Sequence, residues 1–166
     1  MRAVASDHAA VRPDSAAVRE LFAELLCHEV SVGPSAPMDK ADLGTAALAV
    51  YADADQQLYA VMGMQLPLAA ALAAALGPLP AGAAGECVAA SKLTAALSEN
   101  LFQLCKALTS LLNAEGAPPV KLYQVVFPGV PVPPEAVAQL LAPGRRLDLA
   151  VEVARYGTGK FSVSLA

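Results

Sequence analysis

The sequence has little charge, few aromatic residues and no tryptophan. Charged residues make up 16% of its 166 residues, aromatic residues make up 5%, and the formal net charge is -4. No cluster of lysine and arginine indicates binding to nucleic acid or to an anionic membrane surface. The shortage of aromatic side chains disfavours a surface on which bases stack. We therefore expect neither a nucleic-acid partner nor a membrane partner.

Cysteine and histidine are scarce as well. Cys27, Cys87 and Cys105 are an odd number and include no C-x-x-C pair, which disfavours both a disulfide framework and a zinc knuckle. Cys27 and His28 are adjacent, but the one other histidine is His8, near the N-terminus. We expect no metal and no cofactor, and a reduced, cytoplasmic protein. The N-terminus lacks the apolar stretch of a signal peptide.

Several sequence motifs of enzymes and of membrane spans are missing. The sequence contains no G-x-G-x-x-G, no P-loop and no G-x-S-x-G nucleophile elbow, and two histidines make a Ser-His-Asp triad improbable. Residues 66–85 carry no charge, yet they include three prolines and three glycines. This stretch predicts a buried helix that ends at Gly77-Pro78 rather than a membrane span.

The clearest element that is present is a helix over residues 91–113. Leucines recur there at steps of three and four, which is the spacing of one face of an α-helix. This face is expected to be buried and consists of Leu93, Leu97, Leu101, Leu104, Leu108 and Leu111.

The opposite face of this helix is polar. Glu99, Gln103 and Lys106 stand at positions i, i+4 and i+7, so their side chains can meet. A solvated surface is the simplest interpretation, because surface helices generally have a polar face. A surface that binds a partner is the alternative, and Phe102 lies beside these residues.

The remaining pattern predicts strands and helices in alternation. Helices are expected at residues 14–28, 66–76 and 135–141, and a less regular one at 78–90. Strands are expected at residues 29–32, 44–51, 57–64, 120–127, 146–156 and 160–165. A loop is expected at residues 33–43, with hairpin turns at 53–56 and 157–159.

This order of elements predicts an α+β fold, in which long helices pack on one mostly antiparallel sheet. A unit of one helix and three strands is used twice, which suggests an internal pseudo-repeat. Residues 1–13 are expected to form a flexible lead, and residues 14–166 a single domain.

Five segments flank the central helix in a characteristic order: VRELFAELLCHEVSV, TAALAVY and LYAVMGM before it, and PPVKLYQVVFP and YGTGKFSVSL after it. In these segments and their order the sequence resembles the CheX/CheC/FliM group of bacterial chemotaxis and flagellar-switch proteins. The resemblance covers residues 15–166. Within this group it is strongest to CheX, which has one such central helix in a domain of about this length.

The resemblance implies a phosphatase of a response-regulator receiver domain, but the residues that carry this activity are replaced. The family's signature is Asp or Ser, three residues, Glu, two residues, Asn, and a proline about 21 residues further on. At these four places the sequence has Glu99, Gln103, Lys106 and Pro128. Gln103 cannot form the family's ion pair with a receiver lysine, and Lys106 has no acceptor with which to orient water. Asn100 lies about 100° round the helix from Glu99 and is out of register.

We therefore expect a non-catalytic, CheX-like domain of bacterial two-component signalling. Its partner would be a receiver domain or a related signalling protein, bound through Glu99, Phe102, Gln103 and Lys106. One alternative is an active phosphatase with altered residues, in which Lys106 neutralises phosphoryl charge and Glu99 acts as the base. Another is a structural or oligomeric protein. CheX relatives dimerise by strand pairing, and the terminal hairpin is a candidate edge for a homodimer.

Overall fold

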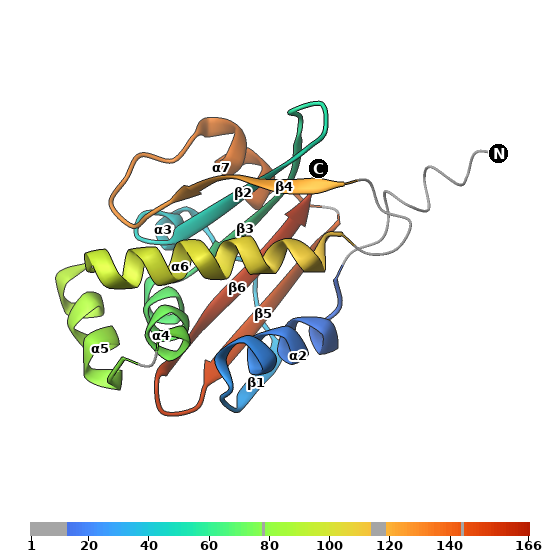
Figure 1. Cartoon of the computed structure of the whole chain (residues 1–166). Helices are drawn as coiled ribbons and strands as arrows, with labels where there is room; N and C mark the ends of the chain where they lie inside the picture. Colours follow the sequence, from blue (N-terminus) through green and yellow to red (C-terminus); the bar gives the residue numbers. More distant parts are fainter. Residues whose placement is uncertain (1–12, 78, 114–118, 144) are drawn as a thin grey trace.

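A six-stranded antiparallel sheet forms the centre of the molecule in the computed structural model, which describes residues 13–77, 79–113, 119–143 and 145–166. The strand order is β1-β5-β6-β3-β2-β4, so β1 and β4 are the two edges (Figure 1). The strands are β1 (Val30–Pro34), β2 (Ala47–Asp53), β3 (Leu58–Met64), β4 (Val120–Val126), β5 (Arg146–Val153) and β6 (Gly157–Leu165). The predicted α+β fold is confirmed. The predicted lead lies, except for residue 13, outside the described residues.

Helices cover both faces of this sheet. The larger core joins one face to α2 (Ser15–Leu26), α4 (Leu66–Leu76) and α6 (Ala95–Ala107), with α5 (Ala81–Ala90) packed on α4. Figure 1 shows α6 crossing this face. A smaller core lies under α3 (Lys40–Leu43) and α7 (Pro134–Leu141) on the opposite face. Both faces of the central hairpin β2–β3 are thus covered, which explains why its residues are apolar almost throughout.

Helix α4 is the buried, alanine-rich helix that the sequence predicts, with the same bounds. Residues 68–75 are all buried, because α4 packs against β6 on one side and against α6 on another. Alanine side chains allow these elements to approach closely. A Cβ atom on Gly159 of β6 would lie 2.8 Å from the Cβ atom of Leu68, so glycine is required where helix and strand meet. No helix among the described residues is long and apolar enough to cross a membrane.

The sheet order agrees with the pseudo-repeat predicted from the sequence. If β1, β2 and β3 are exchanged with β4, β5 and β6, the order β1-β5-β6-β3-β2-β4 reads the same from the other end. The hairpins β2–β3 and β5–β6 meet at the centre, where β3 pairs with β6. The first strand of each half pairs with the hairpin of the other half. Each half therefore completes the sheet of the other.

Three expectations about local structure are wrong. The terminal hairpin turns at residues 154–156, where Arg155 has a φ of 73°, and Gly157–Leu165 is already strand. The expected loop at residues 33–43 holds the end of β1 and the short helix α3, which a reciprocal capping box of Asp39 and Asp42 stabilises. The terminal hairpin is no free edge either, because β6 lies inside the sheet and β5 pairs with β1.

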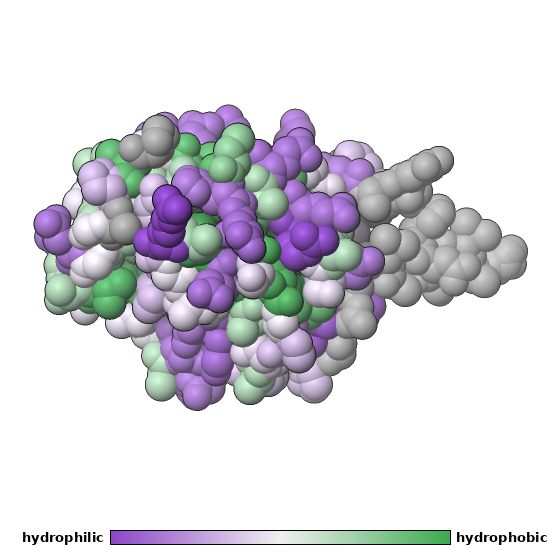
Figure 2. All heavy atoms as spheres, turned by 90° about the horizontal axis from the view of Figure 1, so that it is seen from below, coloured by the Kyte–Doolittle hydropathy of each residue, from purple (hydrophilic) through white to green (hydrophobic). Residues whose placement is uncertain are grey.

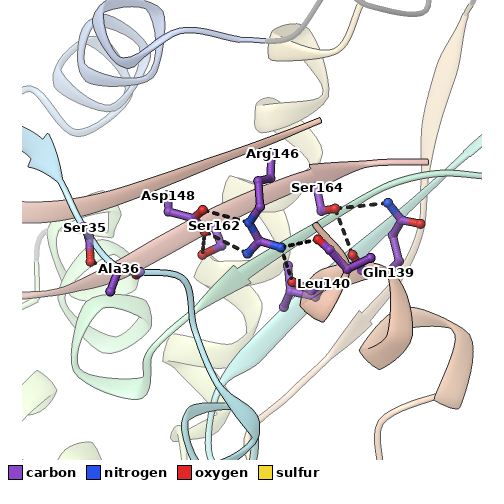
Figure 3. A network of polar contacts seen from close by, with 9 residues as sticks. Ser35, Ala36, Gln139, Leu140, Arg146, Asp148, Ser162 and Ser164 are labelled. Atoms are coloured by element: carbon purple, nitrogen blue, oxygen red, sulfur yellow. Dashed lines mark hydrogen bonds and ion pairs between the residues drawn. The ribbon is translucent and has the colours of Figure 1, made fainter. Parts of the chain in front are cut away.

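A largely buried ion pair lies on the second face of the sheet (Figure 3). The guanidinium of Arg146 donates two hydrogen bonds to the carboxylate of Asp148, at 2.8 and 2.9 Å, and two more to the carbonyl oxygens of Leu140 and Ala142 at the end of α7. The hydroxyl of Ser162 donates to Asp148 at 2.7 Å. Arg146 therefore joins β5 to the C-terminal end of α7, where helix carbonyls need donors.

Candidate functional site

Helix α6 begins and ends inside the range expected from the sequence. Thr94 is its N-cap, and its side-chain oxygen accepts a hydrogen bond of 3.2 Å from the backbone N–H of Leu97. Residues 91–94 lie outside the helix because Ser91 ends α5 in a left-handed conformation, with a φ of 57°. After Ala107 the chain continues as the 3₁₀ helix η1 (Leu108–Leu111). The prediction of one helix over residues 91–113 is therefore too long at both ends.

The two faces of α6 are divided as the sequence predicts. The side chains of Leu97, Leu101 and Leu104, and of Leu108 at the start of η1, are fully buried. Leu93 and Leu111, which were expected on the same buried face, lie outside α6 and are half-buried. On the opposite face the residues Glu99, Phe102, Gln103 and Lys106 are exposed. No described element of the chain covers these four side chains, so together they form a continuous surface, which we call the α6 face.

The four side chains of the α6 face form two pairs, and the two members of each pair lie one helical turn apart. The amide nitrogen of Gln103 donates a hydrogen bond of 3.2 Å to the carboxylate of Glu99. The ammonium of Lys106 lies 6.0 Å from the centroid of the Phe102 ring, at the limit of a cation–π contact. Both contacts follow the i, i+4 spacing and are exposed to water, so each contributes a few tenths of a kcal/mol. The pairs arrange charge and apolar surface more than they stabilise the helix.

A buried tyrosine fixes the position of α6 over the sheet. The hydroxyl of Tyr51 in β2 donates a hydrogen bond of 2.8 Å to the backbone carbonyl of Cys105. Burial raises the pKa of Tyr51 well above its ordinary value, so the hydroxyl stays protonated and remains a donor. Burial also raises the pKa of Cys105 to about 12, which leaves its thiol unreactive.

Asn100 has a structural role that the sequence did not reveal. Its amide donates a hydrogen bond of 3.0 Å to the carbonyl of Ala73, near the end of α4. A Cβ atom on Gly77 would lie 2.0 Å from the Asn100 amide nitrogen, so the glycine leaves room for this side chain. The φ of Gly77 is -99°, an ordinary value, and close approach is therefore the reason for glycine. Asn100 joins two helices and does not belong to the α6 face.

Comparisons with known proteins give structural matches alone: no family model matches the sequence, and no curated protein matches it. FliY from Thermotoga maritima aligns with a TM-score of 0.54 and 11% identity, over 98% of this chain and 89% of that one. FliM in a FliG–FliM complex from H. pylori aligns with a TM-score of 0.55 and 8% identity, over 98% and 91% of the two chains. The FliM middle domain from H. pylori has a TM-score of 0.51 and 7% identity, over 98% and 90%.

The chain has the CheC/CheX/FliM-like fold. This confirms the resemblance read from the sequence at the level of architecture, since the matches cover nearly the whole chain. Within this fold α6 is the helix on which the resemblance puts the phosphatase signature. The positions that correspond to it, Glu99, Gln103 and Lys106, lie together on the exposed face, and Pro128 is buried in the turn after β4.

The chemistry of the α6 face differs from that of the family's phosphatase signature. Gln103 is neutral and uses its amide on Glu99, so the carboxylate of Glu99 is partly occupied. Lys106 offers donors and one positive charge but no acceptor for a proton from water. The acceptors of this face are the carboxylate of Glu99 and the side-chain amide oxygen of Gln103. The face presents an aromatic ring beside a cation, a combination that contacts apolar and acidic groups on a protein surface.

The structure also brings residues to the α6 face that the sequence analysis did not single out. A groove of about 380 Å³ runs between α6 and β4, and it is lined by Phe102, Lys106, Thr109, Val120, Lys121 and Leu122. Lys121 lies at the border of this groove, and its side chain alternates with those of Val120 and Leu122, so it lies on the face of the sheet opposite α6. The alternation of β4 put Lys121 on an exposed position, but the sequence carried no signal that α6 lies beside this strand.

The cysteines and the histidine of the described residues do not form a metal site. Cys27 is exposed and ends α2 with a φ of 55°, while Cys87 and Cys105 are buried. The ring of His28 packs edge-on against Tyr156, with centroids 5.2 Å apart. Among the described residues no three His, Cys, Asp or Glu side chains gather where they could hold a metal ion.

Proposed function

We propose that this chain is a non-catalytic protein-binding domain of chemotaxis or flagellar signalling, and that the α6 face receives its partner. The observation that supports this most is the exposure of Phe102, which is 37% exposed in the middle of a well-formed helix, with the ammonium of Lys106 6.0 Å from its ring centroid. A large aromatic side chain beside a cation is typical of the centre of a binding surface.

The fold of the chain is consistent with a protein partner. The solved structures that share it include FliM bound to FliG and FliM bound to SpeE. The resemblance of the sequence to CheX points to a receiver domain as the partner. We propose a receiver domain or a related signalling protein, which docks on α6 as it would in a phosphatase but keeps its phosphate.

Loss of catalysis follows from the replaced side chains. In the family signature a glutamate pairs with a receiver lysine and an asparagine orients the attacking water. Gln103 and Lys106 stand at these positions, so the ion pair with the receiver lysine is lost and a cation takes the place of the asparagine. The altered residues therefore change the docking chemistry as well as the catalytic chemistry. The surface of the partner that faces Gln103 and Lys106 is therefore expected to differ in charge from that of a receiver on which an ordinary CheX acts.

Binding is tested with purified receiver domains from the source organism, with and without acetyl phosphate, by calorimetry. One or more should bind, and Phe102→Ala together with Lys106→Glu should weaken binding by more than about tenfold, as at the centre of an interface. Lys40→Glu is the matched control, because Lys40 is exposed on α3 on the opposite face of the sheet. Equal losses in the two variants would remove the α6 face from consideration.

Catalysis is tested on any receiver that binds. The lifetime of its aspartyl phosphate is measured alone and with excess protein. We expect no change in the rate of dephosphorylation. An acceleration of about tenfold, which corresponds to about 1.4 kcal/mol of barrier, would establish the alternative of a phosphatase with altered residues. In that case Lys106→Ala and Glu99→Ala should each abolish the acceleration.

A further inference from the structure

The outer side of β4 is an unpaired sheet edge next to the α6 face. Within the described part of the chain β4 pairs with β2 alone, at one end of the strand order. Such an edge presents backbone N–H and C=O groups to an incoming strand. Figure 1 shows β4 at the margin of the sheet and α6 across the sheet face that the larger core covers.

The first position of this edge is already occupied by a side chain that imitates a strand. The amide of Asn113 donates to the carbonyl of Val120 at 3.1 Å, and the N–H of Val120 donates to the amide oxygen of Asn113 at 2.9 Å. An added strand would make the same two bonds. The N–H and C=O of Val120 therefore point away from β2.

Within the described residues, the next position along the edge has no backbone partner. In an antiparallel pair, alternate residues direct both backbone groups to the same side. Val120, Lys121 and Leu122 pair with Asp53, Ala52 and Tyr51 without a register shift, so Leu122 points its N–H and C=O outward like Val120. Among the described residues neither group has another backbone partner. An incoming segment can pair with Leu122 just beyond Asn113.

The charge beside this edge is positive. Two lysines border this edge on its two sides. Lys106 of α6 lines the groove beside the apolar ring of Phe102, and the side chain of Lys121, which alternates with those of Val120 and Leu122, lies on the other face of the sheet. The chain as a whole has a net charge of -4, so this local excess of positive charge is opposite to its overall charge. A segment that carries carboxylates beside an apolar side chain fits both features.

A second copy of the chain fits less well. β4 has the sequence VKLYQVV, in which Lys121 is the one charge. Pairing of β4 with itself would bring the lysines of two copies to the same edge, next to Lys106 of each copy. Like charges across strands are destabilising. The charge pattern therefore favours an acidic strand from a different protein.

We propose that β4 accepts an extended, acidic segment of a protein partner as an additional strand. The segment bonds to the backbone of Leu122, places an apolar side chain against Phe102, and directs carboxylates to Lys106 and Lys121. The inference rests on the proposed function, because it uses part of the α6 face, and it specifies the chemistry of the partner. Recognition by strand addition combines backbone bonds for affinity with side-chain pockets for specificity.

The test begins with a phage-displayed library of random twelve-residue peptides, selected against the full chain. The selected peptides should alternate acidic and apolar residues. The tightest one is synthesised with a fluorescent label, and its affinity is measured by anisotropy. Lys106→Glu and Lys121→Glu should each weaken binding by about tenfold or more, because each puts a like charge beside the peptide carboxylates. The control Lys40→Glu should leave the affinity within about twofold.

Backbone pairing is tested on the peptide, so that the protein stays unchanged. N-methylation removes backbone donors, and it is introduced at alternate residues in two registers. One register should lose binding and the other keep it, since alternate residues of a strand face opposite edges. Selection of neutral or basic peptides, or no selected peptide, overturns the inference. A peptide whose affinity is the same with N-methylation in either register also overturns it. So does a dimer of the chain, detected by sedimentation, whose association becomes tighter in Lys121→Glu.

The two proposals can fail separately. A receiver that needs Phe102 for binding, together with a library that gives no acidic peptide, rejects the β4 edge and keeps the proposed function. A selected acidic peptide with the expected register, together with no binding by any signalling protein, rejects the proposed function and keeps the edge as a strand-binding site.

Discussion

Replacement of Arg146 by methionine tests how the second face of the sheet is held together. The side chains of Arg146 and Asp148 are 13% and 12% exposed, so their contacts are shielded from water. Arg146→Met keeps most of the side-chain volume but removes two bonds to Asp148 and two to the carbonyls at the end of α7. The carboxylate then keeps the hydroxyl of Ser162 as a partner. Removal of one member of a buried pair costs about 3–5 kcal/mol.

The pH dependence of this loss gives a sharper test than its size. Burial raises the pKa of Asp148, but the hydrogen bonds from Arg146 and Ser162 and the charges of Arg146 and Lys160 together lower it below the ordinary 3.8. Because the pKa of Asp148 is lowered in the folded state, the ionised carboxylate stabilises the wild type at pH values above its unfolded pKa. This stabilisation is lost as the pH falls through the folded pKa.

In Arg146→Met the pKa of Asp148 in the folded state should rise, because burial, the largest influence on it, now acts without the hydrogen bonds and the charge of the guanidinium. Protonation of Asp148 at low pH therefore costs the variant less stability than it costs the wild type. The difference in the free energy of unfolding should be largest near pH 7 and should narrow toward pH 4.

Urea unfolding of both proteins, followed by circular dichroism at several pH values, measures this difference. The control is the double variant Arg146→Met with Asp148→Leu, which removes the carboxylate together with the guanidinium that pairs with it. This double variant should be more stable at pH 7 than Arg146→Met alone. A loss of stability that stays the same from pH 7 to pH 4 would refute the account of Asp148 as a buried carboxylate held ionised by Arg146.

Three other predictions concern α6. Tyr51→Phe should lower the free energy of unfolding by about 1 kcal/mol, the usual value of a buried hydrogen bond, and no loss would contradict its role in placing the helix. Gly77→Ala should destabilise the protein by about 1–3 kcal/mol, and clearly less when Asn100→Ala is also present, because a methyl group there displaces this amide; equal losses in a double-mutant cycle would disprove the clash. Gln103→Glu with Lys106→Asn should give dephosphorylation of a receiver that binds, whereas each single change gives little. A bound receiver whose phosphate lifetime stays unchanged would reject the helix register.

Much of the local structure was predictable because it depends on neighbours in the chain. The leucines of α6 repeat at the helical period, and this spacing by itself distinguishes the buried face of the helix from the exposed one. The bounds of α4 followed from Pro67 at its start and Gly77 at its end. The helix ends at residues 91 and 113 were wrong, since caps depend on single side chains and the periodic pattern continues past them.

Contacts between distant segments could not be predicted in this way. The sequence showed that Asn100 is off the polar stripe, but the partner of its amide is a carbonyl of α4, 27 residues earlier in the chain. The groove joins Lys106 to Lys121 only because β4 lies at the edge of the sheet beside α6. No periodicity in either segment carries this information.

The sequence by itself therefore determined the elements, their buried faces and the α6 face, because hydrophobic spacing is a local property of helices and strands. The tertiary structure decided which strand lies at the edge. β5 and β6 have the stronger strand pattern, yet they are interior, and β4 has one neighbour among the strands of the described chain. Strand order is set by competition among all strands for backbone partners and for burial under the helices, and that competition depends on the whole chain.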